Sequence, residues 1–294
     1  MEGQERCTLR WRSTVALAAL ATAIAALGGC GGGDEDEPAH HSRGIALAAR
    51  LPSDDALNIA VADVAAIRRA LGMRPGSIPP TRSDDDDLVF LDEIGPALGV
   101  VQSGEFPRPV VDAAMRRARW IAGVAGDEGV TAFAIDGDSA DLESTLTAAG
   151  MVEDGGEYVP EDGDFAVALG KGLVVFADDP GDAKPVVEKE DGKAPEELVQ
   201  LDGDGDLITL ARFGAACVDA VGTADTPGKP GEIAFFTTAT PDASNITSDA
   251  PEAVPTRVTG DSARITIPKA QEPQDEPPAL LALQSFKIDY DCGA

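Results

Sequence analysis

The sequence predicts an α+β fold in which hairpins build an antiparallel sheet and helices pack against it. Short apolar runs typical of strands recur in pairs separated by tight turns, and helix-like stretches lie between groups of strands instead of alternating regularly with them. The 43% hydrophobic content is ordinary for a globular protein. Residues 44–294 are therefore expected to form a single globular domain.

The first half of this domain opens with an apolar run at 56–61 that predicts a buried strand. Asp63 is then placed to cap a helix that continues to Leu71 and stops at Gly72. The elements expected next are a helix over 88–100 broken at Pro96, a helix over 109–119, strands over 120–124 and 130–135, and a helix capped by Asp138 or Ser139 that ends at Gly150.

The second half alternates further short strands with long polar segments. A meander of three strands is predicted at 157–159, 165–169 and 173–177, with Gly170-Lys171-Gly172 as a hairpin turn. The elements expected after it are helical structure over 194–201, a strand over 207–211, a short helix over 214–221, strands over 233–238, 264–267 and 285–290, and long loops near 240–256 and 268–278.

The N-terminus has the layout of a secretory signal peptide. Three arginines among the first twelve residues precede the uncharged run Thr14–Leu27. As a helix this run spans about 21 Å, which is short of the ~30 Å hydrocarbon core of a bilayer. It therefore favours a cleaved signal segment over the alternative of an uncleaved membrane anchor.

The tetrapeptide Leu27-Gly28-Gly29-Cys30 resembles the lipobox of bacterial lipoproteins. The resemblance implies that residues 1–29 are removed as a lipoprotein signal peptide. It also implies that Cys30 carries acyl chains such as palmitate and anchors the chain to the cell membrane, facing outside the cytoplasm. The order of a short apolar strand and an Arg-containing helix in the domain is loosely similar to uncharacterised actinobacterial lipoproteins.

Residues 30–43 are expected to be a flexible, acidic, Gly-rich tether. His40 and His41 in this segment could bind a metal, but no further ligands lie nearby in the sequence to complete a site. The whole chain has a net charge of −29, and loss of three arginines and two glutamates with the signal peptide leaves about −30. Such a charge repels phosphate backbones and anionic headgroups, so it excludes nucleic acid as a partner. The membrane is then reached through the lipid on Cys30.

Two of the four cysteines, Cys217 and Cys292, remain in the exported domain. An even pair in an oxidising compartment predicts a disulfide, which would tie the C-terminus to the domain. The alternative, Cys217 as a catalytic thiol, lacks an activating histidine because none occurs after His41.

The same absence of histidine removes His-dependent catalysis and His-ligated zinc from the domain. No sequence motif predicts a catalytic residue, a cofactor or a bound metal. Asp202, Asp204 and Asp206 match the first three ligand positions of a calcium loop, but Leu207 stands where that loop needs Gly and Phe213 where it needs Glu. An acidic turn is therefore favoured over a calcium site.

The sequence favours a non-enzymatic envelope lipoprotein that binds a protein or small-molecule partner whose identity the sequence does not specify. Two alternatives stay open. One is a carboxylate-dependent envelope hydrolase, which would need two converging acids in a cleft. The other is a calcium-dependent module built on the Asp202–Asp206 turn.

Overall fold

The computed structural model describes the chain from His40 to Cys292 with gaps. All of the described residues belong to one compact unit, Ala39–Ala294. The described ranges are 40–52, 56–77, 85–103, 106–125, 129–161, 163–190, 192–212, 217–248, 256–269, 277–284 and 288–292.

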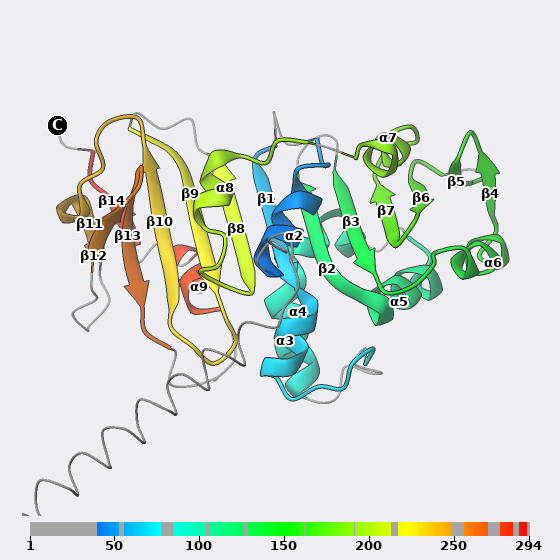
Figure 1. Ribbon diagram of the computed structural model, residues 1–294, viewed down its shortest axis with the longest axis horizontal. Coiled ribbons are helices and arrows are strands. Elements are labelled where there is room, and N and C mark those ends of the chain that lie inside the picture. The colour runs from blue at the N-terminus through cyan, green and yellow to red at the C-terminus, as the bar shows by residue number, and fades with distance from the viewer. Residues whose placement is uncertain are drawn as a thin grey trace, which may run out of the picture. The chain divides into compact units, whose positions relative to one another are not determined.

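Twelve strands form one sheet, and every neighbouring pair in it is antiparallel (Figure 1). The predicted mixed α+β class with an antiparallel sheet is therefore confirmed. In spatial order the strands are β12 (Thr256–Thr259), β13 (Ser262–Ile267), β10 (Gly231–Thr237), β9 (Val218–Asp225), β8 (Leu207–Arg212), β1 (Asn58–Asp63), β2 (Ala118–Ala125), β3 (Val130–Ile135), β7 (Leu173–Ala177), β6 (Ala166–Gly170), β5 (Glu157–Pro160) and β4 (Met151–Asp154).

Strand β1 joins the two halves of the chain at the middle of the sheet. It pairs with β2 on one side and with β8 on the other, so that Val61 lies opposite both Ala122 and Ile208. A separate two-stranded ribbon pairs β11 (Ile246–Ser248) with β14 (Ile288–Tyr290). Both arrangements bring together segments that are far apart in the sequence.

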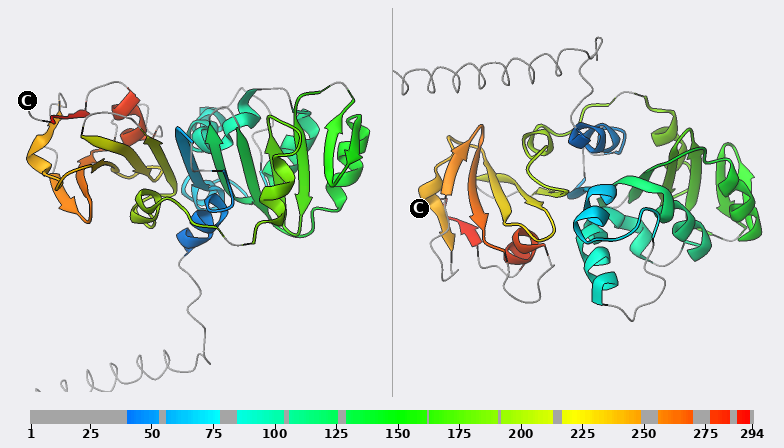
Figure 2. Two further views of the ribbon diagram at one scale, coloured as in Figure 1. Left: turned by 90° about the horizontal axis from the view of Figure 1, so that it is seen from above. Right: turned by 60° about the horizontal axis from the view of Figure 1, so that its bottom comes forward.

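Helices cover both faces of the sheet (Figures 1 and 2). Successive residues of β1 supply different cores, because side chains alternate across a strand: Ile59 and Val61 join one cluster, and Ala60 and Ala62 join the other. The helices that contribute to the first cluster are α2 (His40–Ala48), α7 (Ala183–Glu188) and α8 (Glu196–Gln200). Those that contribute to the second cluster are α3 (Val64–Ala70), α4 (Asp85–Leu98), α5 (Arg108–Arg117) and α6 (Asp141–Ala148). The described chain also contains α9 (Pro278–Gln284) and the 3-10 turns η1 (Gly99–Ser103) and η2 (Ala243–Asn245).

The predicted ends of two helices can be compared with the structure. The Asp63 cap is confirmed, since its Oδ1 accepts a hydrogen bond of 2.8 Å from the Ala66 N–H. Gly150 follows α6 with φ of +83°, a conformation suited to Gly. At the start of α6, however, the capping residue is Ala140. Asp138 instead accepts from the Ala140 N–H, and the Ser139 hydroxyl donates to the carbonyl of Gly170.

Several segments differ from the prediction, and β4, α7 and β12 were not among the expected elements. The helix expected over 214–221 is wrong, because β9 begins at Val218 and pairs with β8 and β10; tertiary pairing overrides local propensity there. The tether expected over 30–43 is too long, since α2 begins at His40. The loop expected near 240–256 contains η2 and β11. The helix α9 begins at the end of the loop expected near 268–278 and was not predicted.

Candidate binding groove

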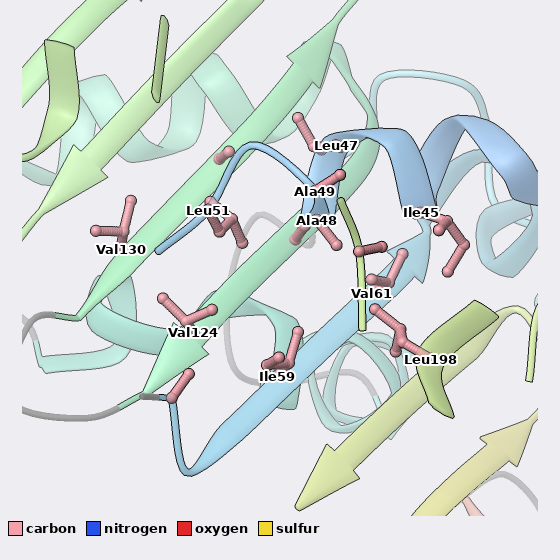
Figure 3. Close-up of a cluster of buried hydrophobic side chains, with 14 of the residues drawn as sticks. Ile45, Leu47, Ala48, Ala49, Leu51, Ile59, Val61, Val124, Val130 and Leu198 are labelled. Carbon is pink, nitrogen blue, oxygen red and sulfur yellow. The ribbon is translucent and has the colours of Figure 1, made fainter. Parts of the chain in front are cut away.

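Helix α2 lies directly on strands β1 and β2 (Figure 3). Ile45 and Ala48 of α2, and Ala49 directly after the helix, are all less than 10% exposed and belong to the first core cluster. Gly44 makes this close approach possible, because a Cβ at that position would overlap the Trp120 ring and the Val61 side chain. Ile45, Ala46 and Ala49 form one wall of a groove.

Helix α8 forms the opposite wall. Leu198 is fully buried in the core, whereas the neighbouring Val199 is 50% exposed. The segment that leads into α8 approaches α2 closely, since a Cβ on Gly192 would overlap the backbone carbonyl of Ala49. These contacts fix the spacing between the two helices at one end of the groove.

The groove has a volume of about 630 Å³ and a mainly apolar lining. Small side chains leave it open, and Val199 stands on its rim as an exposed apolar group. The lining residues are Ile45, Ala46, Ala49, Gly192, Lys193, Ala194, Glu196, Val199 and Gln200.

The charged groups of the groove form an ion pair. Lys193 Nζ donates to Glu196 Oε1 at 2.9 Å. This hydrogen bond raises the pKa of Lys193 and lowers the pKa of Glu196, so both side chains are charged near neutral pH.

Two of the three aspartates of the calcium alternative make contacts with other parts of the sheet. Asp204 Oδ2 accepts a hydrogen bond of 2.6 Å from Arg264. The Asp206 backbone N–H donates to the carbonyl of Asp225 at 2.8 Å, which ties this turn to the sheet. Across the described ranges, no three His, Cys, Asp or Glu side chains come together in a way that could hold a metal, and Asp202 belongs to no such group.

Burial raises the pKa of the Asp225 carboxyl group to about 6. It lies at the end of β9 and is fully buried. Its two oxygens accept hydrogen bonds from the N–H groups of Ala279 (2.8 Å) and Leu280 (3.2 Å), at the start of α9. Asp225 thus holds a helix in place, and it is absent from the lining of the groove.

The predicted disulfide between Cys217 and Cys292 is confirmed, with the two Cα atoms 5.8 Å apart. The alternative of Cys217 as a catalytic thiol is therefore wrong, because its sulfur is bonded. Cys30 lies outside the described residues, as do the side chains of His40 and His41. None of the helices in the described ranges combines the length and the apolar character needed to cross a bilayer.

No protein-family model and no curated protein matches the chain. Among solved structures, it is similar to crystal form I of TP0453, with a TM-score of 0.45 and 9% identity over 82% of this chain and 95% of that one. Crystal form III of the same protein gives a TM-score of 0.42 and 10% identity over 76% of this chain and 94% of that one. Crystal form IV gives a TM-score of 0.45 and 9% identity over 76% of this chain and 92% of that one.

Sequence reasoning missed the groove because it assigned the start of α2 to the tether. The signal was nonetheless present in the apolar spacing of Ile45, Ala48 and Ala49, which places them on one face of a helix. The pairing of that helix with α8 depends on contacts across about 150 residues of sequence, which no local pattern reports.

Proposed function

We propose that this protein is a lipid-anchored lipoprotein of the cell envelope whose domain is a non-enzymatic binding module. The observation that carries the anchor is the Leu27–Cys30 tetrapeptide directly after an Arg-flanked apolar run. The charge of about −30 left after signal cleavage opposes adsorption to anionic lipid, so the acyl chains on Cys30 hold the protein at the membrane.

The groove between α2 and α8 supports the binding role. It combines an apolar lining with a single rim ion pair, and none of its lining residues is a histidine, cysteine, serine, threonine or tyrosine. Mainly apolar concavities with few polar groups are typical of ligand and peptide sites. We propose that the partner inserts a small apolar group or side chain between Ala46 and Val199.

Cys30→Ser tests the anchor. We expect this variant to leave the membrane fraction and to incorporate no labelled palmitate, whereas the wild-type protein is labelled and sediments with membranes. Cys7→Ser is the matched control, since Cys7 lies in the predicted signal peptide and its loss should change neither result. Membrane retention of processed Cys30→Ser would contradict the anchor.

Filling the groove tests the binding site. The neutral apolar dye Nile red should bind the purified protein with a rise in fluorescence, and Ala46→Trp should weaken that binding at least about tenfold by occupying the groove. Val152→Trp is the control, because Val152 is also exposed (58%) but lies on β4, which contributes no residue to the groove. Equal loss in both variants, or none in Ala46→Trp, would exclude the groove as the dye site.

A further inference from the structure

The described C-terminal residues cover an apolar face of the sheet. Strand β14 places Ile288 and Tyr290, 4% and 8% exposed, in a third core cluster with residues of β9, β10 and β13. Among the sheet residues beneath are Val221, Ile233 and Ile265. The β11–β14 ribbon is therefore the lid on this face.

Backbone pairing, hydrogen bonds and packing of buried side chains are the non-covalent contacts of the lid, and among them the Asp291 N–H donates to the carbonyl of Asn245 at 2.8 Å. Strand β14 pairs with β11 over three residues, and an isolated two-stranded ribbon of this kind is marginal. The Tyr290 hydroxyl accepts from the Asp242 N–H at 3.1 Å and from Asn245 Nδ2 at 3.3 Å, and its ring lies 5.6 Å from that of Phe235.

The covalent tie is placed where it acts on the lid. Cys292 is two residues beyond Tyr290, and Cys217 directly precedes β9, a strand paired on both sides within the sheet. Cys292 is exposed and Cys217 is half-buried, so a thiol can reach the bond without global unfolding. We propose that the Cys217–Cys292 disulfide is a redox-sensitive latch that keeps the β11–β14 ribbon closed over the apolar face of β9, β10 and β13.

The opening step is a thiol–disulfide exchange with a dithiol reductant. One thiolate of the reductant attacks Sγ of Cys292, and Cys217 leaves as a thiolate that takes up a proton. The second thiol of the reductant then attacks the mixed disulfide, releases Cys292 as a thiol and leaves the reductant as its own disulfide. Two electrons and two protons reach the protein, and β14 is freed. This device is independent of the proposed anchor and groove.

Hydrogen exchange on the purified chain tests the latch. After complete reduction with a dithiol, confirmed by alkylation and mass, backbone exchange at 246–248 and 288–292 should rise at least about tenfold, and re-oxidation should reverse it. Exchange in β1, β2 and β3 should stay unchanged. Unchanged protection of the ribbon, or loss of protection across β1–β3 as well, would overturn the proposal.

The Cys217→Ser/Cys292→Ser double variant is the matched control. It should exchange as the reduced wild-type chain does, and it should no longer respond to the reductant. A response to reductant in this variant would show that the effect does not pass through the disulfide and would also overturn the latch. Should the variant fail to fold, reduction of the folded wild-type chain decides alone.

Discussion

Arg264 is 2% exposed and connects three parts of the chain through its guanidinium group. Its Nη1 donates to Asp204 at 2.6 Å and to Glu232 at 2.7 Å. Its Nη2 donates to the carbonyl of Gln200 at 2.8 Å, and its Nε donates to the Ser262 hydroxyl at 2.9 Å. An arginine is suited to this position because its planar group presents several donors at fixed angles.

Arg264→Met should lower the free energy of unfolding by about 3–5 kcal/mol, because it leaves the carboxylate of Glu232 buried without its main partner. Arg257→Ala is the control: its partner is also Glu232, but the Arg257 side chain is 57% exposed. Loss of that pair should cost at most about 1 kcal/mol. Urea unfolding of both variants measures the difference, and equal effects would contradict the role given to Arg264.

Asp225 gives stability a defined pH dependence. Burial raises its pKa from 3.8 to about 6, so the folded state binds the proton more tightly than the unfolded state. The resulting contribution to stability is full below about pH 3.8 and is lost as the pH rises through about 6. Two glycines make room for this residue, since a Cβ on Gly205 or Gly231 would overlap Asp225.

Asp225→Asn should remove this titration. Relative to the variant, the wild-type chain should gain free energy of unfolding as the pH falls from about 6 to about 4. Above about pH 7, the difference in free energy of unfolding between the two proteins should be constant. Urea unfolding at a series of pH values measures it. Parallel curves for the two proteins over this range would contradict the assignment to Asp225.

At the scale of elements, short helices are capped by carboxylates from distant strands. Glu157, in β5, accepts hydrogen bonds of 2.6 Å from the N–H groups of Gly181 and Lys184, at the start of α7. Asp225 serves α9 in the same way. A six-residue helix is marginal by itself, so its position depends on this tertiary cap and on burial of Val186.

Glu157→Ala should destabilise the protein by about 1–2 kcal/mol, because it leaves two N–H groups at a helix start without an acceptor. Exchange at 181–188 should rise with it. Glu153→Ala is the control, since Glu153 accepts from the Gly156 N–H within its own exposed turn and its loss should cost less than about 0.5 kcal/mol. Similar effects of the two substitutions would argue against long-range capping of α7.

At the scale of the whole molecule, the net charge of −29 opposes the compact state through self-repulsion. Salt screens exposed charges beyond about 8 Å at physiological ionic strength. Raising NaCl from about 10 mM to 0.5 M should therefore raise Tm, by roughly 2–4 °C for each kcal/mol of repulsion relieved. KCl should act equally, which separates screening from binding of one cation. A Tm that falls, or that responds to one salt alone, would contradict this account.

Local patterns located many elements because their periodicity is written in neighbouring residues. Strand β3 was predicted with its observed bounds, 130–135, and Asp63 was placed correctly at the start of α3. The segment 214–221 failed because a short apolar run suits a helix or a strand equally, and only its partners β8 and β10 decide. The groove was not predicted for a related reason, because its two walls are far apart in sequence.

The sequence by itself determined the class of the fold, the strongly acidic charge and the pairing of Cys217 with Cys292. These depend on composition, on short-range periodicity and on there being two cysteines within residues 44–294. Tertiary structure alone decided that β1 pairs with β8, that Asp204 serves Arg264, and that Asp225 caps a helix 54 residues away. Such contacts form between residues that a sequence pattern treats as unrelated, and burial of both partners in one core selects them.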